Sequence, residues 1–120
     1  MENTEKLTAK KLMIWRETQL SKQLGNCAIC HLPICAGKAV ADHDHSTGHM
    51  RAVLHRGCNA LLGKVENNYK RMGVSEKELE GFAPNLYNYM KADYSMQPLH
   101  PTHGRVRRKS RSKTLKKRKK

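Results

Sequence analysis

The residue types suited to metal and phosphate chemistry are concentrated in one part of this chain. The run Asp42-His43-Asp44-His45 places two carboxylates and two imidazoles next to one another, and Asn59 follows in the same region. Such groups are rarely buried without a partner, so a hydrophobic core does not explain the run. Carboxylate and amide oxygens bind hard divalent cations, and an imidazole accepts a proton near neutral pH. The run therefore indicates a site for metal or phosphate chemistry.

Two pairs of soft metal ligands flank this run. Cys27 and Cys30 are separated by two residues, and the same gap separates His55 from Cys58. Two such pairs, at the separation found here, suit a tetrahedral structural zinc site. A redox dithiol or inert buried thiols are the alternatives. We favour zinc, with the first pair on a tight turn, because a single Cys-x-x-Cys would be weak evidence and the paired arrangement is stronger.

The fourth zinc ligand has two candidates. Cys35 and His31 follow the first pair closely, so Cys35 is an alternative to His55 that would leave His55 for other work. We favour His55, because its spacing to Cys58 repeats the spacing of the first pair. Cys35 is then expected to be a buried spare thiol.

Length and charge limit what the chain can be. With 120 residues, one Phe, one Trp and four Tyr, it has room for one domain with appendages and a thin core that a metal would reinforce. The net charge is +14, and residues 105–120 contain eleven Lys and Arg and no acid, which leaves +3 for the rest. Such a concentration of charge favours nucleic acid as a partner. A solubilising or disordered tail, or a sorting signal, is the alternative.

The sequence shows no signal for export or for a membrane. The first residues are polar, and no apolar run approaches the ~20 residues needed to cross a bilayer. We therefore expect a cytoplasmic protein, in the host cytoplasm if a phage encodes it, and no membrane partner. In a reducing compartment, clustered cysteines bind metal more often than they form disulfides.

The elements that must position the site can be read in chain order. A helix is expected over 4–24, with Gly25 as its left-handed cap and the apolar positions Leu7, Met13, Ile14, Leu20 and Leu24 at roughly helical intervals. Two short strands are expected over 38–41 and 49–54, joined by a turn at 46–48. A helix is expected over 58–72, ended by Gly73, with Ala60, Leu61, Leu62 and Val65 as its packing face. A hairpin followed by a helix would bring Asp42 and His43 close to Asn59.

Beyond the site, Ser75 and Glu78 form a capping-box pattern for a helix that ends near Glu80. A separate helix is expected over 84–91, then an irregular strap over 96–102. The fold class is α+β and mainly helical. The expected organisation is an N-terminal helical element (1–26), a zinc-stapled core (27–73), C-terminal helices with a Pro-containing strap (74–103) and a disordered basic tail (104–120).

The motifs together resemble a known family. Cys-x-x-Cys, Asp-His-Asp-His, Thr-Gly, Arg and Cys-Asn-x-x-Leu-Gly are similar to the phage recombination endonuclease VII family, over about residues 27–63. That family belongs to the nucleases with a ββα-metal (His-Me finger, HNH-like) site. The resemblance implies a homodimer built from flanking helices. It also implies a Mg²⁺- or Mn²⁺-dependent endodeoxyribonuclease that leaves 5′-phosphate and 3′-hydroxyl ends, and that resolves branched DNA such as Holliday junctions in phage recombination and packaging.

Residue roles follow from this resemblance by position. Asp42 and Asn59 would bind the catalytic cation, and His43 would be the general base. Cys27, Cys30 and Cys58 would bind structural zinc. Two departures are visible: the family usually has Cys where this chain has His55, and often has Gly where this chain has Ala52.

Three further residues keep two readings each. Asp44 and His45 would either orient His43 or the metal water through a hydrogen bond, or serve the structure alone. Arg51 would either clamp a phosphate or form a salt bridge to Asp44 or another acid. Two other functions also stay open for the chain: a less selective nicking or homing nuclease, and a zinc-knuckle nucleic-acid binder without catalysis. Nothing in the sequence reports on branched against linear DNA.

Overall fold

The computed structural model describes residues 2–104, and the basic tail from Arg105 onward lies outside the described residues. The elements in order are α1 (Ala9–Lys22), β1 (Ala39–His43), β2 (Met50–His55), α2 (Arg56–Asn68) and α3 (Glu76–Lys91). The structure divides into two compact units, residues 1–80 and the chain from Gly81 onward, and the candidate site lies in the first. The protein is thus a small α+β fold with three helices and one two-stranded sheet in its described part.

The first helix is shorter than expected. It begins at Ala9 instead of Thr4, because the Thr8 side chain caps it by accepting a hydrogen bond from the Lys11 backbone N–H at 3.2 Å. It also ends at Lys22, two residues before the predicted Leu24, while the predicted cap is confirmed: Gly25 has a φ of 80°, and its N–H donates to the Leu20 carbonyl at 2.9 Å. The predicted apolar positions are only partly covered, since Met13 and Ile14 are half exposed.

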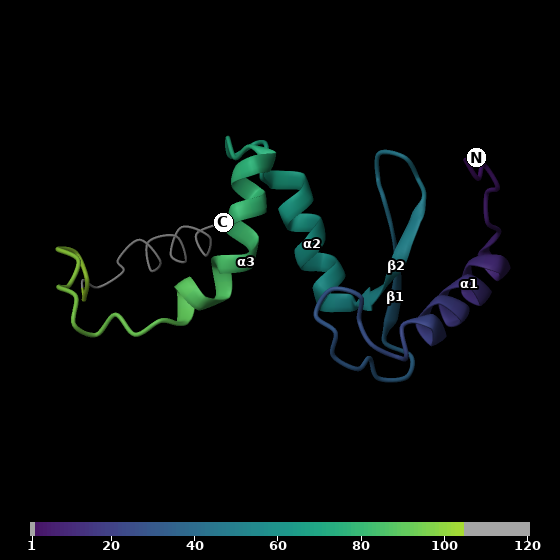
Figure 1. Cartoon of the computed structure of the whole chain (residues 1–120), viewed down its shortest axis with the longest axis horizontal. Helices are drawn as coiled ribbons and strands as arrows, with labels where there is room; N and C mark the ends of the chain where they lie inside the picture. The colour runs from purple at the N-terminus through teal and green to yellow at the C-terminus, as the bar shows by residue number, and fades with distance from the viewer. Residues whose placement is uncertain (1, 105–120) are drawn as a thin grey trace, which may run out of the picture. The chain divides into compact units, whose positions relative to one another are not determined.

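The hairpin is the centre of the first unit, and both α1 and α2 contact its two strands (Figure 1). β1 and β2 pair antiparallel, from Ala39 opposite His55 to Asp42 opposite Ala52. The register then shifts, so that His43 lies opposite Met50 and Arg51 has no cross-strand partner. This extra residue is a β-bulge, a feature that re-aims side chains near the end of a strand.

The core of the described residues is small. Its buried apolar side chains are Cys27, Val53 and Leu54, and the carboxylate of Asp42 is buried with them at 6 % exposure. The Gln23 side-chain amide, just after α1, adds a polar tie to this core. It donates to the Val53 carbonyl and accepts from the Val53 N–H, both at 2.9 Å, as a neighbouring strand would. A core of this size supplies little hydrophobic stabilisation, so a metal cross-link would contribute strongly.

The second helix and its surroundings differ from the expected bounds. α2 begins at Arg56 and ends at Asn68, with Gly73 at a φ of 81° closing the turn that follows. The packing face is also narrower than expected, because Leu61 is 66 % exposed. A capping box does form, with Glu78 N–H donating to the Ser75 hydroxyl at 3.1 Å and Ser75 N–H donating to Glu78 at 2.9 Å.

The expectation of two helices near the C-terminus was wrong. α3 runs without a break from Glu76 to Lys91, and Pro84 lies inside it. Proline removes one backbone donor from a helix interior, which was the reason to expect a break. The missing Pro84 N–H would have bonded to the Glu80 carbonyl, four residues earlier, and the helix continues through this position. In the described part of the chain, no helix is long and apolar enough to cross a membrane.

Candidate functional site

Four metal-ligating side chains converge although they come from three separate elements. Their ligand atoms all lie within 4.8 Å of one another, and the residues are Cys27, Cys30, His55 and Cys58. The first two sit on a tight turn, in which the His31 N–H donates to the Cys27 carbonyl at 2.9 Å. His55 ends β2 and Cys58 lies in the first turn of α2. A metal bound here would join the turn, the strand and the helix.

The orientation of His55 leaves one ring nitrogen for a metal. Its Nε2 lies 2.9 Å from the Pro33 carbonyl oxygen, and because a carbonyl only accepts, Nε2 carries the proton. Nδ1 is then the free nitrogen, and it lies 3.3 Å from the Cys30 sulfur and 3.8 Å from the Cys58 sulfur. A carbonyl partner on the outer nitrogen is how metal-binding histidines are usually held in place.

The thiols of Cys27 and Cys58 differ in pKa. Burial would raise the pKa of Cys27, but hydrogen bonds from the backbone of Cys30, His55 and Ile29 more than offset it and lower that pKa to about 6. Burial raises the pKa of Cys58 to about 11, and its neighbours Cys30 and Cys27 add to the shift. One thiolate is thus already present at neutral pH, whereas another ligand releases its proton only when a cation arrives.

The cluster fits a structural zinc ion. Three sulfurs and one imidazole are a ligand set typical of zinc, and tetrahedral bonds of ~2.0–2.3 Å put neighbouring ligand atoms about 3.3–3.8 Å apart. The two distances from His55 Nδ1 already lie in this range. Cys35 is exposed and lies outside the cluster, so the expectation of a buried spare thiol was wrong.

The second group of candidate residues lies at the end of β1. Asp42 is buried and His43, the next residue, is exposed to solvent, since successive strand residues face opposite sides. Asp42 could therefore hold a cation against the core while His43 faces outward. The His43 ring lies beside that of His45, with ring centres 4.5 Å apart and planes tilted by 52°.

Arg51 forms salt bridges with two acids. Its Nε donates to Asp42 Oδ2 at 2.7 Å and its Nη2 donates to Asp42 Oδ1 at 3.1 Å. Its Nη1 donates to Glu66 Oε2 at 2.8 Å. The hydrogen bonds to Glu66 and then to Asp42 raise the pKa of Arg51. Of the two readings of this arginine, the structure shows the salt bridge, with Asp42 and Glu66 as the acids in place of Asp44.

Asp44 holds the loop between the strands. Its Oδ1 accepts from the Ser46 N–H at 2.8 Å and from the Thr47 N–H at 3.2 Å, and these bonds lower its pKa. Its backbone N–H donates to the His49 carbonyl at 2.8 Å. These bonds are those of a turn-forming aspartate.

Asn59 is placed close to the hairpin but outside the salt bridges. It lies in the first turn of α2, is half-buried, and takes no part in the salt bridges of Asp42, Arg51 and Glu66. α2 begins directly after β2 and contacts both strands of the hairpin. An amide oxygen there suits a hard cation, as the carboxylate of Asp42 does.

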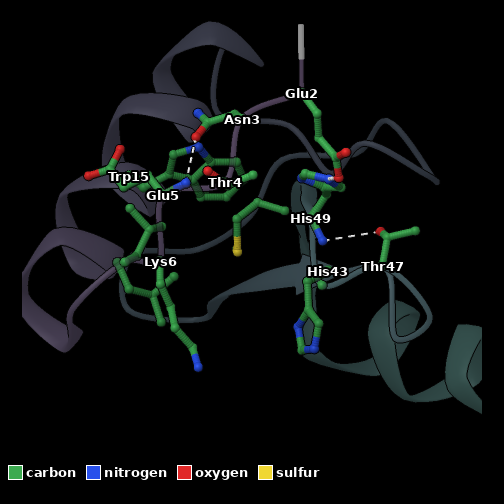
Figure 2. A pocket seen from close by; sticks show the side chains of 13 residues that line it. Glu2, Asn3, Thr4, Glu5, Lys6, Trp15, His43, Thr47 and His49 are labelled. Atoms are coloured by element: carbon green, nitrogen blue, oxygen red, sulfur yellow. Dashed lines mark hydrogen bonds and ion pairs between the residues drawn. The ribbon is translucent and has the colours of Figure 1, made fainter.

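A pocket of about 730 Å³ opens beside His43. Figure 2 shows Trp15 and the N-terminal segment on one side of it, and His43, Thr47 and His49 on the other. Glu2 Oε2 lies 3.1 Å from His49 Nε2 and joins the two sides. Trp15 is partly exposed at this pocket.

Two residues of the site escaped the sequence reasoning. Glu66 partners Arg51, and Gln23 pairs with the backbone of Val53. Glu66 lies seven residues after Asn59, which is two helical turns, so both belong to the same side of α2. The seven-residue spacing was the sequence feature from which Glu66 could have been identified as part of the site. Gln23 carried none, since a glutamine near a helix end is ordinary.

A family comparison agrees with this geometry. Residues 4–78 match the family model described as recombination endonuclease VII. The matched segment covers more than half of the chain and contains the four clustered metal ligands, Asp42, His43 and Asn59. The chain therefore belongs to the recombination endonuclease VII family, and this membership implies a nuclease that acts on DNA.

Proposed function

We propose that this protein is an endodeoxyribonuclease whose reaction centre is formed by Asp42, His43 and Asn59. The observation that carries the proposal is the end of β1, where a buried carboxylate and an exposed imidazole are consecutive residues beside a pocket. This arrangement separates the two tasks of hydrolysis. The buried group can hold a cation, while the exposed group can exchange protons with water.

The chemistry assigns one role to each residue. A Mg²⁺ or Mn²⁺ ion, held by the oxygens of Asp42 and Asn59, would stabilise negative charge on the phosphate and on the leaving 3′ oxygen. One ring nitrogen of His43 accepts the proton of the attacking water. The water oxygen bonds to phosphorus, the bond to the 3′ oxygen breaks, and that oxygen takes a proton from solvent, so that the products carry 5′-phosphate and 3′-hydroxyl ends. His45, stacked beside His43, and Asp44, which shapes the loop, support the position of the base.

The zinc cluster would keep these groups in register. With Zn²⁺ on Cys27, Cys30, His55 and Cys58, the start of α2 is fixed to the end of β2. Asn59 follows Cys58 directly, so fixing that sulfur also fixes the amide. The clustered ligands and the small core support this structural role for zinc.

The substrate we propose is branched DNA, such as a Holliday junction formed in phage recombination and packaging. Family membership supports the branched substrate, and the net charge of +14 supports DNA as the partner. The basic segment 105–120 would contact the phosphate backbone without reading sequence.

A homodimer is the form in which two strands of a junction would be cut together. α3 carries Phe82, Leu86 and Met90 at spacings of four residues, exposed by 57 %, 39 % and 58 %. Residues four apart lie on one side of a helix, so the three form an apolar stripe that a second copy would cover. Analytical ultracentrifugation of wild type and Leu86→Asp tests this form; a monomeric wild type contradicts it.

Cleavage of a labelled four-way junction beside a linear duplex, with Mg²⁺ and with EDTA, tests the activity. His43→Ala should lower the cleavage rate by about 10²–10⁴-fold, because the general base is lost, and should leave DNA affinity unchanged. His103→Ala is the matched control, since it removes an exposed histidine outside the site. Junction cleavage by His43→Ala at the wild-type rate would show that His43 is not the base. Equal cleavage of both DNAs would favour the less selective nuclease, and binding without cleavage would favour the non-catalytic binder.

A further inference from the structure

One guanidinium links two acids from different elements at the candidate cation site. Arg51 donates to both oxygens of Asp42 on β1, at 2.7 and 3.1 Å, and to both oxygens of Glu66 on α2, at 2.8 and 3.3 Å. Charge-assisted bonds of this forked kind are among the stronger hydrogen bonds in proteins. The positive charge of Arg51 therefore sits against the carboxylate that is proposed to hold the catalytic cation.

The bulge in β2 explains how Arg51 reaches Asp42. In an unbroken ladder Arg51 would lie opposite His43, and its side chain would share the face of His43 instead of that of Asp42. The register shift leaves Arg51 unpaired and gives it and Ala52 the single opposing residue Asp42. The contact with Asp42 is thus built into the backbone.

Burial makes the two salt bridges unequal. The Asp42 side chain is 7 % exposed, whereas those of Arg51 and Glu66 are 33 % and 37 % exposed. A buried carboxylate needs a cation partner, and Arg51 supplies it in this structure. A divalent cation that binds Asp42 either displaces Arg51 from one of these oxygens or shares the oxygen with it, and in both cases two positive charges compete for one carboxylate. Glu66 lies nearer to solvent, and its carboxylate can still accept hydrogen bonds from the Arg51 guanidinium after a cation has displaced Arg51 from Asp42.

We propose that Arg51 is a competing counter-ion of Asp42 and that Glu66 is a positioning residue that holds Arg51 when a divalent cation displaces it. Together the two residues set the affinity of the site for the cation. This inference rests on the proposed function, because it takes Asp42 as a ligand of the catalytic cation.

Binding of Mn²⁺ to the full-length, zinc-loaded protein, measured by electron paramagnetic resonance without DNA, tests the inference. Arg51→Met should tighten Mn²⁺ binding by about tenfold or more, because the competing hydrogen bonds to a charged group are gone. Glu66→Gln should weaken it by about three- to tenfold, because Arg51 then has only Asp42 as its partner. Arg71→Met and Glu80→Gln are matched controls at exposed positions outside the salt bridges, and they should bind as wild type does.

The double variant separates an effect through Arg51 from direct ligation by Glu66. In the Arg51→Met background, Glu66→Gln should change Mn²⁺ affinity less than it does in the wild type. An equal or larger change would make Glu66 a ligand and overturn its positioning role. Zinc content and circular dichroism show whether each variant is folded, and Arg51→Lys, which keeps the charge but not the fork, replaces Arg51→Met if the latter unfolds.

The two proposals fail in different ways. If wild type binds Mn²⁺, Asp42→Asn loses that binding and Arg51→Met binds no more tightly than wild type, the competition is wrong while the site stands. If wild type binds no Mn²⁺ beyond the zinc cluster, the cation site itself is wrong, and both proposals fall.

Discussion

The clustered thiols with His55 and the proposed cation site at Asp42 differ in how their ligand atoms are arranged. At the zinc cluster, four ligand atoms already face one another within 4.8 Å. At Asp42, both carboxylate oxygens are occupied by a guanidinium from within the chain. The first arrangement favours an ion that enters once and stays, because nothing has to move aside. The second favours an ion that exchanges, because the protein supplies a substitute when the ion leaves. A structural metal site and a catalytic metal site therefore have different requirements.

The largest expected effect is loss of the zinc cluster. Cys27→Ser should leave less than one zinc per chain and remove most of the helical circular dichroism signal. The reason is that structural zinc contributes about 10–16 kcal/mol in small zinc domains, and the core here is small. Cys35→Ser is the matched control, since Cys35 is exposed and lies outside the cluster. Folded Cys27→Ser protein without zinc would show that the cluster does not hold the fold together.

A smaller effect is expected at the exchanging site. Asp42→Asn should raise the Mg²⁺ concentration needed for half-maximal junction cleavage by about tenfold or more, because a neutral amide replaces a charged ligand. Zinc should remain at one per chain, as measured by elemental analysis on the same sample. Loss of zinc from Asp42→Asn would mean that the two regions are coupled, and the contrast between them would have to be abandoned.

A pH titration sharpens the contrast further. Above pH 6 the Cys27 thiol is already largely deprotonated, since its pKa is about 6, whereas Cys58, with a pKa of about 11, must still release a proton to bind zinc. Below pH 6 Cys27 is protonated too, as is His55, whose pKa is raised by its hydrogen bond to the Pro33 carbonyl. Zinc affinity should therefore rise with pH, and more steeply below pH 6 than above pH 7.

Calorimetry in buffers of different ionisation enthalpy counts the protons released. We expect about one more proton released per zinc at pH 5.5 than at pH 7.5. Cation binding at Asp42 should not add to this difference, because the competing group there is the Arg51 guanidinium, which stays protonated at both pH values. Equal proton release at the two pH values would contradict the difference between the two thiols.

The smallest effect on either region is expected from the tail. Deletion of residues 105–120 should weaken DNA binding and flatten its salt dependence, because up to eleven cations no longer displace counterions from DNA. Zinc content, Mg²⁺ requirement and cleavage at saturating enzyme should not change. An unchanged affinity across a salt titration would assign the tail another role.

Local sequence was sufficient where one element decides the outcome. The turn at 46–48, the cap at Gly25 and the capping box at Ser75 were predicted, because each depends on residues only a few positions apart. The same logic failed at α3, where Pro84 was expected to break a helix that instead continues. A proline lowers the stability of a helix interior without excluding it, so residue preferences alone do not decide whether the helix continues.

The sequence by itself determined which chemistry is available: cysteine and histidine ligands in two pairs of the same spacing, and a carboxylate next to a histidine. Residue types and short spacings are enough for that, because ligand preferences belong to the side chains. Only the tertiary structure decided the partners. His55 lies in the cluster in place of Cys35, and Arg51 pairs with Asp42 and Glu66 instead of Asp44. These choices depend on a bulge and on the packing of α2 against the hairpin, which bring together residues far apart in the chain.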